Sequence, residues 1–315
     1  MSGDNGPGEA TGAGVRHFLD VDDLPAVEPV LDLGGELKAA HRAGEPYRRL
    51  PDRTLAMLFE KPSTRTRISF ETGMTRLGGH ALMLAPEHTQ LGRGEPLSDT
   101  ARVLSRYVDA VMVRTGPHET VAELAAHATV PIVNGLTDDA HPCQTLADLL
   151  TIREAFGGFA DVSAAWVGDG NNVAQSFAVG AAMVGLDLTV ATPPGYELDE
   201  TVLERAADHP GTVETTHDPA AAVAGADVVY TDVWVSMGQD AERERRLADF
   251  EGFQVNAELL ERAAPDARVL HCLPAHRGEE ITEAVLLSDA SLVWDQAENR
   301  MHAQNGLLVW LLDRA

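Results

Sequence analysis

Short apolar runs alternate with helix-like patterns along most of this chain. Each run is bounded by polar or glycine-rich residues, as for strands buried in a parallel sheet. The alternation predicts the α/β class, with mainly parallel sheets flanked by helices. The strands predicted in the first half are 55–59, 81–84, 110–113 and 131–133, and those in the second half are 164–167, 188–191, 228–231, 269–270 and 292–294.

Two further helical patterns stand out, one between the two halves of the chain and one near its C-terminus. Residues 141–156 carry apolar side chains at helical spacing and follow the last strand of the first half, and residues 306–312 form an apolar closing helix. We expect two lobes of similar size, each with its own sheet, and a helix at 141–156 bridging them. Ligands of open α/β sheets bind beyond the carboxyl ends of the strands, so the active site is expected in the cleft between the lobes.

Polar residues follow five of the predicted strands. They are Arg114, Asn134, the segment 168–172, Asp232, and the pair His271 and Cys272. Because parallel strands end at one edge of their sheet, these residues are expected to face the cleft.

Residues 63–67, Ser-Thr-Arg-Thr-Arg, lie between a predicted strand and a predicted helix. Free backbone N–H groups and the helix dipole favour an anion at such an N-terminus, and hydroxyl and guanidinium groups can complete its shell. Arg65 and Arg67 are about 200° apart on a regular helix, so both can reach one anion only at an irregular turn. The ordinary alternative is a helix cap followed by a solvated basic turn.

Composition places the 315-residue chain among globular proteins, with 44% hydrophobic and 23% charged residues. No apolar run approaches the ~18 residues of a membrane helix. The polar start, residues 1–16, is read as a flexible tail on a cytoplasmic protein. Cys143 and Cys272 are the only cysteines, which fits a reducing compartment.

The charge balance is strongly acidic, with 24 basic against 49 acidic residues and a formal net charge of −25. We therefore do not expect this protein to bind nucleic acid or anionic membranes. Lysine occurs only at Lys38 and Lys61, so nearly all cations are arginine. This composition resembles that of proteins that work at high salt, although an acidic surface also occurs at ordinary salt.

Salt is expected to stabilise the fold, because a Debye length of about 3 Å at 1 M salt screens repulsion within the acidic surface. The melting temperature should fall as KCl is lowered from molar to millimolar concentration. Thermal unfolding followed across that series checks this, and a constant melting temperature would contradict it.

The second half carries further motifs, each with an ordinary structural explanation. His141-Pro142-Cys143-Gln144 opens the bridging helix and offers a donor for a carbonyl oxygen, or a merely structural histidine. The segment 168–173, Gly-Asp-Gly-Asn-Asn-Val, lacks the third glycine and the later acidic residue of a dinucleotide fingerprint, which argues against a dehydrogenase.

Asp232 and Ser236 suit an amino-acid head group, or cap a helix. Cys272 follows His271 and could be a nucleophile or a small buried side chain; a non-nucleophilic residue lining the site is favoured. Arg300 precedes the closing helix, where an ion pair of Glu298 would be the ordinary reading.

Five motifs together resemble the aspartate/ornithine carbamoyltransferase family, from about residue 17 to the end. They are Phe-Glu-Lys-Pro-Ser-Thr-Arg-Thr-Arg at 59–67, His-Pro-Cys-Gln at 141–144, Asp-Val-Trp-Val-Ser-Met-Gly at 232–238, His-Cys-Leu-Pro at 271–274 and Asp-Gln-Ala-Glu-Asn-Arg-Met-His at 295–302. The first two are shared by both branches of the family, and the third and fourth resemble the ornithine branch.

The resemblance implies transfer of a carbamoyl group from carbamoyl phosphate to ornithine, without metal or organic cofactor. It implies a carbamoyl-phosphate-binding domain at 17–142, completed by the C-terminal helix at about 297–315, and an ornithine-binding domain at 143–296. A carbamoyltransferase for putrescine or an acylated ornithine, or a non-catalytic anion-binding relative, are the alternatives. The direction of the reaction in metabolism stays open.

The resemblance also implies roles for individual residues. Arg65, Arg114, His141, Asp232 and Cys272 would be catalytic. The residues implied to bind carbamoyl phosphate are Ser63, Thr64, Arg65, Thr66, Gln90, Arg114, His141, Gln144, Cys272, Leu273 and Arg300. Those implied for ornithine are Asn172, Asp232, Ser236 and Met237, with Asn171 as the alternative to Asn172. Gln90 would reach into a neighbouring subunit, so trimers or multiples of trimers would follow.

Overall fold

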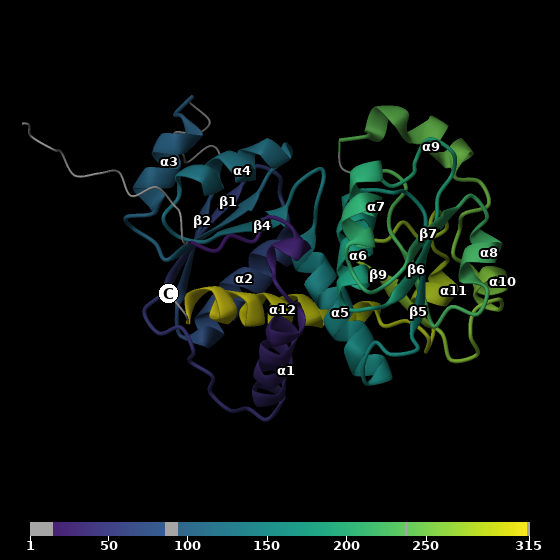
Figure 1. The fold of residues 1–315 in the computed structure, drawn as a ribbon, viewed down its shortest axis with the longest axis horizontal. Helices are drawn as coiled ribbons and strands as arrows, with labels where there is room; N and C mark the ends of the chain where they lie inside the picture. The colour runs from purple at the N-terminus through teal and green to yellow at the C-terminus, as the bar shows by residue number, and fades with distance from the viewer. Residues whose placement is uncertain (1–14, 86–93, 237, 314–315) are drawn as a thin grey trace, which may run out of the picture.

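Two lobes, each built on one parallel sheet, make up the protein in the computed structural model, which describes residues 15–85, 94–236 and 238–313 (Figure 1). The predicted tail at 1–16 lies almost wholly outside these residues. The first sheet has the order β2-β1-β3-β4 and the second has the order β7-β6-β5-β8-β9. The strands are β1 Thr54–Phe59, β2 His80–Leu84, β3 Ala110–Arg114, β4 Ile132–Leu136, β5 Ser163–Val167, β6 Asp187–Ala191, β7 Val213–Thr216, β8 Val228–Thr231 and β9 Arg268–His271.

Helices cover both faces of each sheet, which confirms the predicted α/β class (Figure 1). The helices of the first lobe are α1 Glu28–Arg42, α2 Thr64–Leu77, α3 Leu97–Leu104 and α4 His118–His127. Those of the second lobe are α6 Asn172–Met183, α7 Glu200–Ala207, α8 Pro219–Val223, α9 Arg243–Asp249, α10 Ala257–Leu260 and α11 Glu283–Leu286. Two others, α5 Pro142–Phe156 and α12 Val293–Leu312, connect the lobes, and the short 3-10 turns η1 Val21–Asp23 and η4 Asp240–Glu242 complete the described elements.

One apolar core runs through both lobes. On the first sheet it includes Leu55 and Met57, which face Phe70 and Met74 of α2. It continues through the buried apolar residues of α5 to α6 and to Trp166 in the second sheet. The remaining face of each sheet has its own cluster, beneath α3 and α4 in the first lobe and around Phe250 in the second. The bridging helix predicted at 141–156 is therefore confirmed as α5, and it is buried between the lobes.

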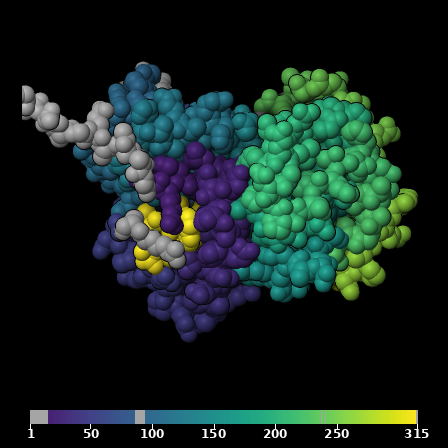
Figure 2. All heavy atoms as spheres, viewed as in Figure 1, coloured from purple at the N-terminus to yellow at the C-terminus, as the bar shows by residue number. Residues whose placement is uncertain are grey.

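The C-terminal helix α12 starts in the second lobe and crosses into the first. Its first residue, Val293, packs in the cluster around Phe250, whereas Leu307 to Leu312 are buried in the shared core. It crosses α1 where Gly306 meets Gly34, and a Cβ on Gly306 would lie 2.4 Å from the carbonyl oxygen of Val30. Figure 2 shows its yellow atoms between the purple atoms of the N-terminal segments.

Two secondary-structure predictions were wrong. The strand predicted at 292–294 is the first turn of α12, because a three-residue apolar run does not distinguish the buried side of a helix from a strand. Strand β7 was missed because it lies at the edge of its sheet and reads Val-Glu-Thr-Thr, with no fully buried residue. Within the described ranges, every helix is too short or too polar to cross a bilayer.

Candidate active site

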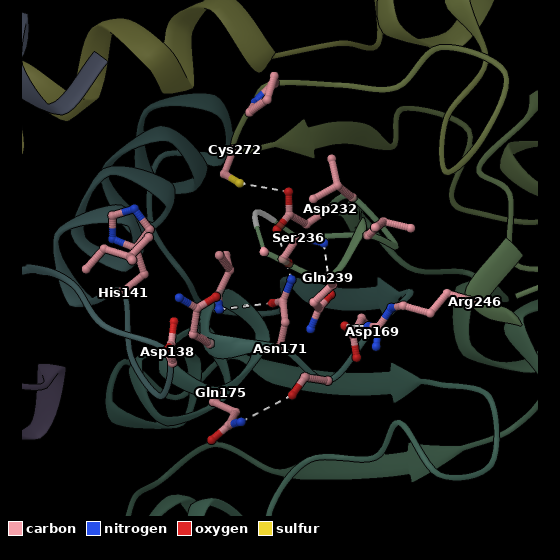
Figure 3. Close-up of a pocket in the computed structure, with 18 of the residues that line it drawn as sticks. Asp138, His141, Asp169, Asn171, Gln175, Asp232, Ser236, Gln239, Arg246 and Cys272 are labelled. Atoms are coloured by element: carbon pink, nitrogen blue, oxygen red, sulfur yellow. Dashed lines mark hydrogen bonds and ion pairs between the residues drawn. The ribbon is translucent and has the colours of Figure 1, made fainter. Parts of the chain in front are cut away.

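A cleft of about 1200 Å³ lies between the lobes, at the carboxyl ends of strands from both sheets. The first lobe contributes the start of α2 and the end of β3. The second contributes the start of α6 and the segments after β8 and β9, with Asn171, Asp232 and Cys272 labelled in Figure 3. The predicted site residues that line it are Ser63, Thr64, Arg65, Thr66, Arg114, His141, Asn172, Asp232, Ser236, Cys272, Leu273 and Arg300. The prediction of a cleft site is confirmed.

The start of α2 forms the wall of the cleft in the first lobe. Ser63 is the N-cap, and its hydroxyl oxygen accepts a hydrogen bond from the Thr66 backbone N–H at 3.3 Å. The first turn of α2 carries no acidic residue that would repel an anion. The helix is regular here, so Arg67 points away from Arg65 and its Nε donates to Glu71 at 2.9 Å. The cap and the anion-binding turn are thus the same structure, and Arg65 alone of the two arginines lines the cleft.

Three guanidinium groups gather at this turn. Arg114 Nη1 lies 3.4 Å and Arg300 Nη2 3.5 Å from the Thr66 hydroxyl oxygen, and Arg65 Nη2 donates to the Leu273 carbonyl oxygen at 2.8 Å. None of the three pairs with a carboxylate in the part of the chain that the structure describes. Burial, together with Arg300 and Arg65, lowers the pKa of Arg114 to about 10. Cations held together without a counter-charge favour an anionic ligand.

His141 faces the same three arginines from the start of α5. Burial, and then Arg300, Arg114 and Arg65, lower the pKa of His141 well below its usual value. The ring is therefore neutral near pH 7 and can donate one hydrogen bond without adding charge. Its backbone N–H donates to the Ser176 hydroxyl at 2.9 Å, which joins α5 to α6.

Gln144 lies behind Arg300 rather than on the cleft surface. Its Oε1 accepts from Arg300 Nη1 at 2.7 Å, and its Nε2 donates to Asp148 Oδ1 at 2.7 Å. Asp148 also accepts from Gln296 and from the Tyr230 hydroxyl, so this fully buried carboxyl joins α5, α12 and β8. Burial raises the pKa of Asp148 to about 7, although these hydrogen bonds act in the opposite direction.

Asp148→Asn is expected to flatten the pH dependence of stability. The folded protein keeps the Asp148 proton up to about pH 7, whereas the unfolded chain loses it near its ordinary pKa of about 3.9. The carboxyl therefore lowers the free energy of unfolding by up to about 1.4 kcal/mol per pH unit as pH rises between these values, and no further above them. An asparagine oxygen can still accept from both glutamines. Denaturant unfolding of both proteins between about pH 4 and pH 7 at high salt checks this, and equal slopes would show that Asp148 is ionised throughout.

Asp232 and Cys272 form the opposing polar group in the second lobe (Figure 3). The Cys272 thiol donates to Asp232 Oδ1 at 3.0 Å, and Asn171 Nδ2 donates to Asp232 Oδ2 at 2.9 Å. Burial and the nearby Asp232 carboxylate raise the pKa of Cys272 well above its usual value. The thiol therefore stays protonated, which fits the prediction of a non-nucleophilic cysteine lining the site.

Asn171 and Asn172 both line the cleft but differ in their contacts. Asn171 is the N-cap of α6 and also positions Asp232, so both ends of its amide are in use. Asn172 Nδ2 donates to the Thr137 carbonyl oxygen at 2.6 Å, across the lobes.

The segment after Asp232 is held by a buried ion pair. Arg246 of α9 donates to the Trp234 carbonyl oxygen and to Asp169, and it lies 4.7 Å from the centre of the Tyr196 ring. Burial raises the pKa of Asp169 to about 6 despite this arginine. The backbone N–H of Ser236 donates to Gln239 Oε1 at 2.9 Å, which closes a turn beside the cleft.

Some predicted residues lie elsewhere. Asn134 is inside β4, fully buried, and donates to the Leu19 carbonyl oxygen, and His271 is inside β9 and pairs with Glu280. Neither lines the cleft, because the strands run further than the apolar runs suggested. Gln90 and Met237 lie outside the described residues. Asp148 and Arg246 were not predicted near the site, and Asn171 was predicted only as the alternative to Asn172 for ornithine. The one sequence signal for the Asn171–Asp232 hydrogen bond was that each residue follows a predicted strand, at 164–167 and at 228–231.

Fold and site together define a two-lobed α/β enzyme whose cleft has arginines at a helix N-terminus on one wall and a buried carboxylate on the other. The family model described as aspartate/ornithine carbamoyltransferase, carbamoyl-P binding domain, matches residues 16–154, and that of the Asp/Orn binding domain matches residues 160–311. The chain belongs to the aspartate/ornithine carbamoyltransferase family.

Individual relatives agree along nearly the whole chain. The ornithine carbamoyltransferase of Haloquadratum walsbyi is 63% identical over 300 residues, which cover 94% of this chain and 97% of the relative. The anabolic ornithine carbamoyltransferase of Pyrococcus furiosus is 52% identical over 303 residues, covering 94% and 96%. The solved ornithine carbamoyltransferase structure from P. furiosus superposes with a TM-score of 0.91 at 51% identity, over 95% of this chain and 98% of that one.

Proposed function

We propose that this protein transfers the carbamoyl group of carbamoyl phosphate to the side-chain amine of L-ornithine, giving L-citrulline and phosphate. The observation that carries the proposal is that two different polar groups line one cleft. One is a set of three guanidinium groups that have no described carboxylate partner, and the other is the Asp232–Cys272 pair. The first group suits a phosphate compound and the second an amine. The names of the relatives support the same substrates.

Carbamoyl phosphate is assigned to the wall of the first lobe. Its phosphate would be held by Ser63, Thr64, Thr66 and Arg65 at the start of α2, with Arg114 beside it. His141 and Arg300 would donate to the carbamoyl oxygen, and Gln144 would hold Arg300 in place through its 2.7 Å hydrogen bond. Cys272 and Leu273 would close the far side, and Gln90 would come from a neighbouring subunit.

Ornithine is assigned to the second lobe. Asp232, Ser236, Asn172 and Met237 would bind it. Asn171 is assigned a positioning role, because it already caps α6 and holds Asp232. The Arg246–Asp169 pair would fix the segment that carries Ser236.

In the reaction, the amine nitrogen attacks the carbonyl carbon, a C–N bond forms, and the C–O bond to phosphate breaks. A lysine-like amine with a pKa near 10.4 is more than about 99% protonated at pH 7, so the site must remove a proton before attack. Asp232 would accept that proton, and Cys272, which donates to Asp232, would help to aim the amine. Neutral His141, Arg114 and the Thr66 hydroxyl would stabilise the oxyanion, and Arg65 with the start of α2 would take up the charge of the departing phosphate.

Each substrate would be bound mainly by one domain. We assign carbamoyl phosphate to 17–142 with the closing helix at about 297–315, and ornithine to 143–296.

We further propose a cytoplasmic homo-oligomer of three chains or a multiple of three. Exposed apolar side chains on the first lobe, in the edge strand β2, in α2 and α3 and just after α3, support an interface between copies; they are Ile68, Leu82, Met83, Val103 and Tyr107.

One assay tests the reaction. Citrulline formation from carbamoyl phosphate and ornithine is measured at low and high salt, with putrescine and aspartate as competing acceptors. Carbamoylation of ornithine far above the other two is expected. Transfer to putrescine instead would reassign the acceptor, and no transfer to any amine would leave an anion-binding protein without this activity.

A further inference from the structure

Three potential metal ligands gather in the segment that follows β9, and one of them, His276, also lines the edge of the cleft. His276, Glu279 and Glu280 each offer one ligand atom, and these atoms lie within 4.8 Å of one another. The His276 Nδ1 to Glu279 Oε2 distance is 3.7 Å. Ligands at about 2.0–2.2 Å from a tetrahedral zinc ion lie about 3.3–3.6 Å apart, so only small movements would be needed.

The same residues carry buried polar atoms without a partner. Within the described ranges, His276 Nδ1, Glu279 Oε2 and Glu280 Oε2 are buried and form no hydrogen bond. Glu280 is the most telling of the three, because its side chain is fully buried. An orphaned carboxylate oxygen inside a protein is costly unless something compensates it.

The other oxygen of each glutamate is already engaged, which fixes the free one in place. Glu280 Oε1 accepts from His271 Nε2 at 2.9 Å and from the His276 backbone N–H at 2.6 Å. Glu279 Oε1 is paired with Arg243 of α9. Glu279 thus has one described arginine partner, and the free oxygens of Glu279 and Glu280 receive no hydrogen bond from the described residues.

We propose that His276, Glu279 and Glu280 bind a divalent transition-metal cation, Zn²⁺ in preference to Mg²⁺ or Ca²⁺. One imidazole nitrogen and two carboxylate oxygens are the mixed ligand set that zinc accepts, whereas the harder cations favour oxygen alone. The cation compensates the buried Glu280 and satisfies all three orphaned atoms.

A second group of potential ligands, Asp232, His271 and Cys272, lies close by and must be distinguished from this one. There the atoms are already partnered, since the Cys272 thiol donates to Asp232 and His271 Nδ1 accepts from the Leu273 backbone N–H at 2.9 Å. The proposed site contains no reacting group of the transfer, and its cation is structural. It would tie the segment carrying Leu273 to α9, because Glu279 contacts Arg243.

The test measures zinc binding directly in a Cys272→Ser background, which removes the thiol. Equilibrium dialysis against Zn²⁺ is expected to give about one ion per chain. His276→Gln and Glu279→Gln in the same background should each weaken binding at least about tenfold, since even groups that only support a metal ligand are worth 10–100-fold. His217→Gln is the matched control, because His217 Nε2 lies 3.8 Å from Glu197 in an exposed pair to which the described residues add no third ligand.

A second measurement guards against variants that fold poorly. Zn²⁺ should raise the melting temperature of Cys272→Ser and of the His217→Gln control, but not that of His276→Gln or Glu279→Gln. Failure of the Cys272→Ser protein to bind zinc, or unchanged affinity in both ligand variants, would overturn the proposal. Binding is read without turnover, so the result is independent of the proposed reaction.

Discussion

Arg65→Ala is expected to lower kcat/KM for carbamoyl phosphate by at least about 10³-fold while the protein stays folded. Removing one donor to a developing negative charge costs about 10²–10³-fold, and Arg65 would serve both the bound phosphate and the departing one. Its side chain is exposed at the cleft and its one described hydrogen bond is to the Leu273 carbonyl, so little stability depends on it. Steady-state kinetics at high salt and thermal unfolding measure the two effects.

Arg67→Ala is the matched control. This arginine is two residues along the same helix, but its guanidinium pairs with Glu71 on the outer surface. Its loss removes the same charge from the same element and should change kcat/KM by less than about twofold, because Arg67 does not line the cleft. Stability should also change little, since an exposed i,i+4 pair contributes only about 0.3–0.5 kcal/mol. Equal losses in the two variants would mean that net charge, rather than contact with the substrate, decides activity.

Asp232→Asn is expected to lower kcat/KM for ornithine by about 10²–10⁴-fold, the usual range for a group that moves a proton in the reaction. Asparagine keeps the size of the side chain but cannot accept the amine's proton. It also replaces one of the oxygens that now accept from Cys272 and Asn171. Binding of inorganic phosphate, measured by calorimetry, should be nearly unchanged because the residues assigned to the phosphate group lie on the other lobe.

Asp138→Asn provides the comparison for this variant. Asp138 also lines the cleft, but it is exposed and paired with Lys61 at 2.6 Å. A loss confined to ornithine kinetics in Asp232→Asn, with little change in Asp138→Asn, fits the proposed roles. Weaker phosphate binding in Asp232→Asn would instead assign this carboxylate to the organisation of the whole cleft.

The sequence revealed those parts of the fold that depend on local pattern. Continuous apolar runs predicted eight of the nine described strands. The residues at 63–67 predicted the helix N-terminus, because a cap depends only on residues next to each other in the chain. Strand β7 escaped because its neighbours, rather than its own side chains, make it a strand. The apolar pattern marked only 306–312 of α12, because Gln296, Asn299, His302 and Gln304 before it are polar yet buried.

The supports of the site were hidden for a related reason. Asp148 reads as an ordinary polar position on a helix, and its importance comes from Gln296 and Tyr230, which are 148 and 82 residues away in the chain. Arg246 reads as one of several arginines on a charged helix, and only the fold brings it to Asp169. Long-range partners of this kind leave no spacing to recognise.

The path of α12 bears on the order in which the two lobes can complete their folding. The core of the first lobe contains Leu307 to Leu312, and α12 fills the groove of α1 at Gly34. A ribosome completes the first sheet early, but the lobe built on it lacks part of its interior until the last residues emerge. We therefore expect the lobe that is synthesised first to become stable last. Until the C-terminal residues have been synthesised, the nascent chain would expose the apolar surface that α12 covers in the finished protein.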